Sequence, residues 1–467
     1  MNLQLRVCIK YLLSSVCVLF SFAFNSVADS SSLKIYVYDL PRWKNSSTFG
    51  DSSNFEDISD SDYGLDQIFP EVLKNSTYVT TKPEEADYFF ADAWIFWPHA
   101  LNHMDDILLD IRAFGPWFDR KNGSDHIFVI TADQGRCQYE EKEGRKPHHA
   151  VRNSIFIQHY GGSLHSNDFF NEDLTKRWGG ELDRLMTMTE ALRSRDGCTA
   201  PNIRCTEDVY GRLTPFLCHI PYQDIVVPPA VFERRPPHPC LHCHFGVHNE
   251  MAWKTPYTHP ELISPSHTRD TLLFHAGHAL FQKDNGFYSL GARQNMIEMF
   301  GRGQKPGYEL AEEPLGSNYW TKLLKSKFCL GTTGTGWGSR FKVALVHGCI
   351  PVIMMDGVKN EFEEQLPLME YTVRIPGYMA YRTPQILDEL VTSGRAAQMQ
   401  ENLKCAWRLH WWRSPHGKAF EVVMCELKRR KLELPKGRIH IDFKTCSIKC
   451  IDEIIPIVDS GNNFLSA

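Results

Sequence analysis

The most constraining feature of the sequence is a glycine-rich block between two apolar runs, FCLGTTGTGWGSRFKVALVHGCIPVIMM at residues 328–355. The first apolar run is predicted to be a strand, and the glycines after it a loop. Phe341, Ala344 and Leu345 then fall on one face of a helix, and Gly348 is typical of a helix end. The second apolar run predicts another strand. The block therefore indicates a β-loop-α-β unit of a parallel sheet.

The loop in this unit has the residues that a phosphate group needs. A helix N-terminus presents free N–H groups with partial positive charge, and glycines let the backbone approach oxygen atoms closely. Ser339 is predicted to be the N-cap, and Arg340 can add a charge-assisted contact. Neither the Walker pattern nor the G-x-G-x-x-G dinucleotide pattern occurs here. The alternative is a tight turn beneath a packed helix, with no ligand.

Residues 1–28 have the features of a targeting segment. Arg6 and Lys10 precede an apolar stretch, and small residues follow it at the spacing of a cleavage site. The stretch has about 14 residues, whereas a membrane span needs roughly 20. We favour a secretory signal peptide, with a signal-anchor as the alternative. Both interpretations place the rest of the chain in the lumen of the secretory pathway.

Cysteine usage agrees with an oxidising compartment. Two of the 14 cysteines, Cys8 and Cys17, lie in the leader, and the even number that remains favours disulfides. The segment HPCLHCHFGVH (238–248) contains C-x-x-C with histidines nearby, but a second ligand pair at zinc spacing is missing. We therefore prefer disulfides to zinc. The net charge of −5, without a basic block, argues against nucleic acid as a partner.

Strand and helix patterns alternate along most of the chain, which is typical of parallel sheets with crossover helices. Strands are expected at 34–40, 86–96, 126–133, 153–161, 271–277 and 372–375. Helices are expected at 66–74, 104–114, 293–300, 384–391 and 396–430, and one leads into a strand within 318–328. The predicted parts are an N-terminal α/β half at 33–230, a Cys- and Pro-rich inter-domain region at 196–260, a C-terminal α/β half at 265–430 and an irregular tail at 431–467.

The block SKFCLGTTGTGWGSRFKVALVHGCIPVIMMDGV (326–358) resembles the exostosin-like glycosyltransferases, family 47 of the sugar transferases. The resemblance continues outward in the same order along the chain. Its further blocks are KIYVYDLP (34–41), KPEEADYFF (82–90), DHIFVITADQG (125–135), DIVVPP (224–229), LLFHAG (272–277) and YSLGARQ (288–294). Together these blocks cover roughly residues 34–392, and they are most similar to plant and green-algal members.

This resemblance implies a GT-B architecture, in which two Rossmann-like domains have a cleft between them. The C-terminal domain would hold a UDP-sugar and the N-terminal domain a glycan acceptor. Family members are inverting enzymes of the Golgi that build wall polysaccharides or glycosaminoglycans, and the fold implies no metal or other cofactor. Asp60-Ser61-Asp62 fits the letters of a D-x-D metal motif but lies in a polar loop. Membrane anchoring and homo- or hetero-oligomerisation stay open.

The family resemblance assigns five positions of this chain to binding of the sugar donor. The resemblance assigns Arg340 to the donor diphosphate, with close contacts from Gly334, Gly336 and Ser339. Arg293, in the GARQ segment, is a second candidate for the diphosphate. A positive site is needed because the departing UDP gains negative charge in the transition state, and arginine suits contacts to two oxygens. A helix cap or surface ion pair is the alternative for Arg293.

An inverting transfer also needs a base near the acceptor hydroxyl. Asp133 follows the end of a predicted strand, where open α/β sheets place ligands, and we expect it to be this base. An Asx cap on the next turn is the alternative. His275 and His278 follow another strand, and buried or rim positions without ligand are the more common case for such histidines.

Two departures from the family pattern favour a non-catalytic subunit, and the first of them weakens the donor assignment. Val343 stands where many members carry an acidic residue for the ribose hydroxyls, and Ala132 replaces a histidine. Glu361, Glu363 and Glu364 could bind ribose instead, although a solvated acidic face is the preferred interpretation. The leading hypothesis is thus a UDP-sugar-dependent transferase. A non-catalytic glycan-binding or partner subunit with the same fold is the alternative.

Overall fold

The computed structural model describes residues 32–44, 63–95, 103–137, 149–162, 205–207, 213–215, 218–231, 233, 268–279, 288–313, 315–316, 318–334, 336–433 and 439–450. The chain divides into Met1–Ser32 and a compact unit from Leu33 onward. Within the described ranges, no helix combines the length and the apolarity that a membrane crossing requires.

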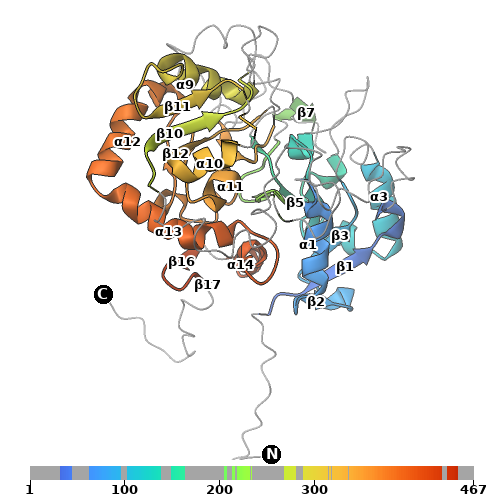
Figure 1. The fold of residues 1–467 in the computed structure, drawn as a ribbon. Coiled ribbons are helices and arrows are strands. Elements are labelled where there is room, and N and C mark those ends of the chain that lie inside the picture. Colours follow the sequence, from blue (N-terminus) through green and yellow to red (C-terminus); the bar gives the residue numbers. More distant parts are fainter. Residues whose placement is uncertain are drawn as a thin grey trace, which may run out of the picture. The chain divides into compact units, whose positions relative to one another are not determined.

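The N-terminal half is built on a six-stranded parallel sheet (Figure 1). Its strands β3 and β4 are buried at every position, because the runs YFFAD and HIFVI are covered on both faces. The order is β2-β1-β3-β4-β5-β9, with β1 Ile35–Asp39, β2 Val79–Thr80, β3 Tyr88–Asp92, β4 His126–Ile130, β5 Ile155–Gln158 and β9 Ile225–Val226. The helices of this half are α1 Leu65–Lys74, α3 Met104–Ala113 and α4 Trp117–Arg120.

The C-terminal half repeats this plan with a five-stranded parallel sheet. Its order is β11-β10-β12-β13-β15, with β10 Thr271–Ala276, β11 Tyr308–Ala311, β12 Ser326–Gly331, β13 Ile350–Ile353 and β15 Val373–Arg374. Its helices are α9 Ala292–Phe300, α10 Asn318–Lys325, α11 Arg340–Val346, α12 Thr383–Thr392, α13 Arg395–Leu409 and α14 Ala419–Lys431. Short 3-10 helices occur at Pro41–Lys44, Pro83–Glu85, Gly135–Cys137, His149–Val151, Tyr288–Gly291, Leu368–Glu370 and Gly377–Arg382.

Both sheets have the same winding. Numbered within each half, the strands run 2-1-3-4-5 in space, with one more strand at the edge of the first sheet. This is a doubly wound order in which the direction of winding reverses beside the first strand. The predicted fold class is confirmed: the chain has two Rossmann-like halves, the GT-B architecture. The predicted strands and helices appear with ends shifted by a few residues.

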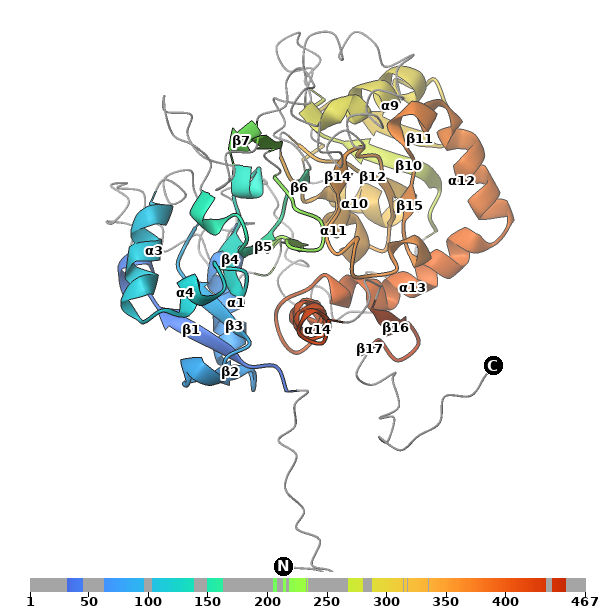
Figure 2. The ribbon, with the colours of Figure 1, turned by 180° about the vertical axis from the view of Figure 1, so that it is seen from behind.

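Contacts from distant segments join the two halves. The short strand β14 (Val358–Lys359) of the C-terminal half pairs with β6 (Gly161–Gly162) of the N-terminal half. Helix α14 packs against the N-terminal half (Figure 2), where the Tyr88 hydroxyl donates to the Leu427 carbonyl over 3.2 Å. Phe69 of α1 packs against Phe420 of α14 and against Trp412. One hydrophobic core therefore runs through both halves.

The C-terminal segments differ from expectation in two respects. The helical segment 396–430 is two helices, because Pro415 and Gly417 lie in the turn between α13 and α14. The tail expected to be irregular contains an antiparallel hairpin of β16 (His440–Asp442) and β17 (Ser447–Lys449). A second small hairpin within the described ranges pairs β7 (Cys205–Glu207) with β8 (Leu213–Pro215). The segments 42–65 and 196–260 otherwise lie mostly outside the described residues, as does the zinc candidate 238–248.

The chain contains disulfides, as the cysteine count favoured, and three of them join pairs of described cysteines. Cys329–Cys349 links the strand before the glycine loop to the residue before β13, and the two cysteines are 20 positions apart. Cys405–Cys446 and Cys425–Cys450 fasten the hairpin β16–β17 to helices α13 and α14. The hairpin is short and would be marginal alone, so these bonds explain how a tail of this composition becomes ordered.

Asp66 in the first turn of α1 gives a prediction for stability against pH. Its side chain is buried, and neither carboxylate oxygen has a hydrogen-bond partner of good geometry among the described residues. Burial raises the pKa of Asp66 to about 8, and the nearby N–H of Gln67 offsets this only in part. The folded chain therefore holds a proton that the unfolded chain releases. This contribution to stability is complete below about pH 4 and is lost as the pH rises through 8.

We expect Asp66→Asn to raise the free energy of unfolding by up to about 5 kcal/mol at pH 7.5, because the amide carries no proton-linked cost. The gain should shrink as the pH is lowered towards 4.5. Thermal unfolding at a series of pH values measures both effects, with the exposed Asp106→Asn as control. A gain that does not depend on pH would contradict the buried, protonated carboxyl.

Candidate functional site

Two loops meet where the winding of the C-terminal sheet reverses. One follows β10 at Gly277, and the other is the glycine loop that follows β12. Strands β10 and β12 are neighbours, so their carboxyl ends open on one crevice, which is where doubly wound sheets bind ligands. Gly277 has a φ of +146°, and a Cβ atom there would collide with the Arg340 guanidinium. Glycine at this position therefore lets Arg340 lie against the backbone of the other loop.

Arg340 is the first residue of α11 and is half-buried. Its Nη1 donates to the Tyr319 hydroxyl over 2.9 Å, and its guanidinium lies 5.6 Å from the centre of the Tyr319 ring. Tyr319 belongs to α10, so a second helix orients the arginine. The charge lies at the reversal point of the sheet, as expected for a residue that contacts an anion there.

Arg293 is buried and joins the two loops. Its Nη1 donates to the His278 carbonyl over 2.9 Å, while Nε and Nη2 donate to Thr332 Oγ1 over 2.9 Å and to the Thr333 carbonyl over 2.8 Å. Each nitrogen of the guanidinium thus has a protein acceptor. These contacts show that Arg293 positions the loop. Direct contact of Arg293 with a diphosphate stays a proposal.

The two arginines lie close enough to act on the same histidine. His275, at the end of β10, is buried, and burial together with the Arg340 and Arg293 charges holds its pKa well below the ordinary value. The imidazole is therefore neutral, and the crevice has a net positive field from two guanidinium groups. His278 is more than half exposed and lies 3.3 Å from Glu313.

The other predicted donor-binding residues, Gly334, Gly336 and Ser339, lie in the glycine loop and directly before α11. The Gly334 carbonyl accepts a bond from the Ser289 N–H over 2.9 Å. Gly336 lies directly against the backbone of Asp133, with no room for a Cβ atom. Ser339 is the residue before α11, as predicted, but its side chain makes no capping bond. The backbone that Gly336 approaches closely therefore belongs to the N-terminal half of the protein.

Asp133 lies on the opposite side of this contact, after β4. Its carboxylate is exposed, and Oδ1 accepts a bond of 2.6 Å from the Tyr63 hydroxyl. Its carbonyl accepts the Trp337 N–H over 2.9 Å. The structure thus brings Asp133 of the N-terminal half against the glycine loop of the C-terminal half, a contact that could not be predicted from sequence.

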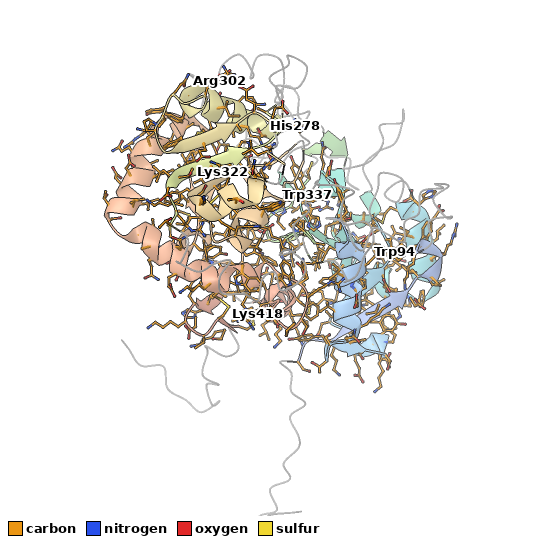
Figure 3. All side chains as sticks on the ribbon, in the orientation of Figure 1. Trp94, His278, Arg302, Lys322, Trp337 and Lys418 are labelled. Atoms are coloured by element: carbon orange, nitrogen blue, oxygen red, sulfur yellow. A yellow bond between two sulfur atoms is a disulfide. The ribbon has the colours of Figure 1, made fainter. Side chains whose placement is uncertain are left out.

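Trp337 is the side chain that fills this joint (Figure 3). Its indole N–H donates to the Thr131 carbonyl over 3.2 Å, and its ring packs edge-on against His159 and Tyr63 at 5.0 Å and 5.2 Å between centres. Burial lowers the pKa of His159 to about 3, so that imidazole is neutral. Trp337 carries no local sequence signal, because a tryptophan between glycines has no periodic partner that reveals its contacts.

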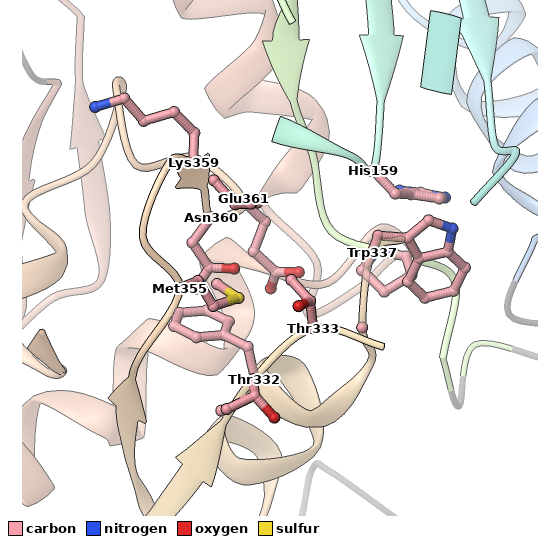
Figure 4. Close-up of a pocket in the computed structure, with 13 residues that line it drawn as sticks. His159, Thr332, Thr333, Trp337, Met355, Lys359, Asn360 and Glu361 are labelled. Atoms are coloured by element: carbon pink, nitrogen blue, oxygen red, sulfur yellow. The ribbon is translucent and has the colours of Figure 1, made fainter. Parts of the chain in front are cut away.

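A small pocket lies between the glycine loop, the turn after β13 and His159 (Figure 4). Its lining residues are His159, Pro229, Gly331, Thr332, Thr333, Trp337, Gly338, Phe341, Met355, Val358, Lys359, Asn360 and Glu361. The space within it is about 20 Å³, enough for a water molecule. A sugar or nucleotide would enter only if the walls move apart.

The acidic residues near 358–366 are not a solvated face, contrary to the preferred interpretation above. Glu361 is buried, and its Oε1 lies 2.8 Å from His410 Nδ1, while His410 Nε2 lies 3.0 Å from the Tyr371 hydroxyl. Glu363 accepts a bond from Arg374, and Glu364 lies 3.8 Å from His219. The pairing of β14 with β6 folds this turn inward, which local sequence does not reveal.

A buried ion pair supports the pocket from behind. Lys342 of α11 and Glu233 are both fully buried and are paired with each other. Lys342 Nζ also donates to the Pro229 carbonyl, and Glu233 accepts the N–H groups of Trp412 and Arg413. Sequence reasoning missed this pair, because a lysine within a helical pattern is normally assigned to solvent.

In the described part of the chain, no group of three or more His, Cys, Asp or Glu side chains is arranged to hold a metal ion. The polar groups that converge on the site are instead guanidinium, hydroxyl, amide and carboxylate groups. The D-x-D letters at 60–62 lie outside the described residues.

Comparison with known proteins gives a family and several relatives. Residues 29–177 and 244–390 match the Exostosin GT47 domain. A probable glucuronosyltransferase of rice is 24% identical over 87% of this chain and 82% of its own length. The probable glucuronoxylan glucuronosyltransferase IRX7 of Arabidopsis thaliana is 22% identical over 80% of this chain and 70% of its own.

Among solved structures, a Listeria monocytogenes protein classed as a UDP-N-acetylglucosamine 2-epimerase aligns with 88% of this chain and all of its own. Its identity is 11% and its TM-score 0.27, so the fold assignment rests on the two sheets described above. The family match covers well over half of the sequence, including the loop with Arg340 and the strand before Asp133. The chain therefore belongs to the exostosin GT47 family of glycosyltransferases.

Proposed function

We propose that this chain is an inverting glycosyltransferase that moves a sugar from a UDP-sugar to a glycan acceptor in the Golgi lumen. The observation that carries the proposal is the juxtaposition of an exposed carboxylate, Asp133, with the glycine loop that leads to Arg340. One half supplies a group able to accept a proton, and the other supplies cationic groups for a leaving diphosphate. The name of the Arabidopsis relative, a probable glucuronoxylan glucuronosyltransferase, supports a polysaccharide as acceptor.

In the proposed reaction, Asp133 takes the proton from an acceptor hydroxyl, whose oxygen attacks the anomeric carbon of the donor sugar. The bond from that carbon to the diphosphate breaks, and its electron pair leaves with UDP. Attack from the side opposite UDP inverts the configuration. Tyr63 holds the Asp133 carboxylate through Oδ1 and leaves Oδ2 for the proton. No step in this scheme needs a redox partner.

Arg340 neutralises charge that develops on the departing diphosphate. Charge that appears only in the transition state is where a preorganised cation gives the largest rate effect. Arg293 fixes the positions of Thr332 and Thr333 in the loop, so we assign it to positioning the loop around the donor. Donor entry requires the contact between Trp337 and His159 to widen, since the pocket holds about 20 Å³.

The test is binding of UDP followed by turnover. We expect UDP to raise the melting temperature of the purified chain, and a UDP-sugar to be hydrolysed or transferred slowly. Asp133→Asn should lower transfer by about 100-fold or more and leave the Kd of UDP within twofold. If neither UDP nor any UDP-sugar shifts the melting temperature, the transferase proposal fails and the non-catalytic subunit becomes the better explanation.

A further inference from the structure

Three buried polar side chains line the pocket beside the glycine loop. The exposed fractions of Thr333, Asn360 and Glu361 are 4%, 7% and 4%. Thr333 Oγ1 and Asn360 Nδ2 have no hydrogen-bond partner within the described ranges. Figure 4 shows the three side chains directed at a common space. Buried polar atoms without partners are costly, so Thr333 Oγ1 and Asn360 Nδ2 need a water or a ligand group in this space.

The third group is a carboxylate held in place from behind. His410 contacts Glu361 Oε1, and Tyr371 in turn contacts His410. The pocket thus offers a hydroxyl, an amide donor and a fixed carboxylate acceptor. Its other walls include the apolar surfaces of Trp337, Phe341 and Met355. Donors and acceptors in alternation, beside an aromatic face, are complementary to a ring that carries hydroxyl groups.

The charges around the pocket disfavour an anionic ring. Among the lining residues that the structure describes, Lys359 is the one cationic side chain. Figure 4 shows its amine directed away from the pocket, and it lies 4.0 Å from Glu363. Arg293 lies below Thr332 and Thr333 with Nε, Nη1 and Nη2 all donating to the protein, and Lys342 is paired with Glu233. A second carboxylate in this space would therefore face Glu361 without a cation directed at it.

We propose that this pocket, once the contact between Trp337 and His159 widens, takes the glycosyl ring of the donor and selects neutral sugars over uronic acids. The inference rests on the proposed function and adds the class of sugar transferred. It separates this chain from the rice and Arabidopsis relatives, whose names describe transfer of a glucuronosyl group. Glu361 is the residue that discriminates, because a carboxylate there accepts bonds from ring hydroxyls and repels a uronate.

Two donor pairs test the proposal, since each pair differs only at carbon 6. Calorimetric titration of the full chain gives Kd values for UDP, for UDP-glucose against UDP-glucuronate, and for UDP-galactose against UDP-galacturonate. We expect the neutral member of at least one pair to bind ten times or more tighter than its uronate. Glu361→Gln should reduce that ratio to about threefold or less, while the Kd of UDP alone changes by less than threefold.

Glu401→Gln, an exposed substitution of the same kind on α13, should leave every ratio as in the parent chain. If UDP binds but the uronates bind as tightly as the neutral sugars, the selectivity proposal is overturned and the proposed function stands. An unchanged ratio in Glu361→Gln overturns the role of that residue. If UDP itself does not bind, the proposed function fails, and this inference fails with it.

Discussion

Replacing Arg340 with alanine is expected to lower the rate of sugar transfer by about 100- to 1,000-fold while the protein stays folded. The guanidinium is half-buried at the reversal point of the C-terminal sheet, where Tyr319 orients it and Gly277 makes room for it. Its loss removes a cation at the place where the leaving diphosphate gains charge. Turnover of the best donor, measured beside the thermal unfolding curve, separates this effect from misfolding.

Two further variants sharpen the result. Arg340→Lys keeps the charge but loses the planar two-point contact, so we expect an intermediate rate. Arg302→Ala removes an arginine that is paired with Glu312 on the surface, and its rate should match that of the parent chain. Full activity in Arg340→Ala would place the leaving group elsewhere and leave the glycine loop as a structural turn.

The second large effect concerns stability. We expect Lys342→Ala to lower the free energy of unfolding by about 3–5 kcal/mol, because it leaves the Glu233 carboxylate buried without its cation. Burial raises the pKa of Glu233, and Lys342 is the main charge that opposes this shift. Without the lysine, Glu233 should take up a proton near neutral pH, so the loss should be larger at pH 8 than at pH 6.

A double variant tests whether the charge pair or the packing matters. Lys342→Met with Glu233→Gln keeps most of the volume and removes both charges, so it should recover much of the stability lost in Lys342→Ala. The exposed pair Lys322–Glu309 is the control, and Lys322→Ala should cost less than about 1 kcal/mol. The melting temperatures of the parent chain, Lys342→Ala, the double variant and Lys322→Ala show whether the charge pair or the packing matters. Equal losses in the buried and surface variants would rule out an important buried pair.

How much of this molecule can be predicted from its sequence depends on how far apart along the chain the interacting residues lie. Strands such as His126–Ile130 and Ile350–Ile353 were predicted because a short apolar run carries its own signal. The proximity of Arg293 and Arg340 could also be expected, since both follow strands that are neighbours in a doubly wound sheet.

The remaining features depend on contacts between segments that are distant in sequence. Lys342 and Glu233 are 109 positions apart, and Asp133 meets the glycine loop across some 200 residues. Glu361 looked exposed because its neighbours are acidic, and only the pairing of β14 with β6 places it inside. No local pattern of hydrophobicity or turn residues reports such pairings, so half of the candidate site became visible only in three dimensions.

The bond between Cys329 and Cys349 has a practical consequence. It closes a covalent ring around the glycine loop and α11, so the segment with Arg340 is tethered at both ends before any ligand arrives. A tethered loop has less conformational entropy to lose on binding. Protein made in a reducing cytosol would lack this preorganisation, and donor affinities measured on such material would understate those of the oxidised chain.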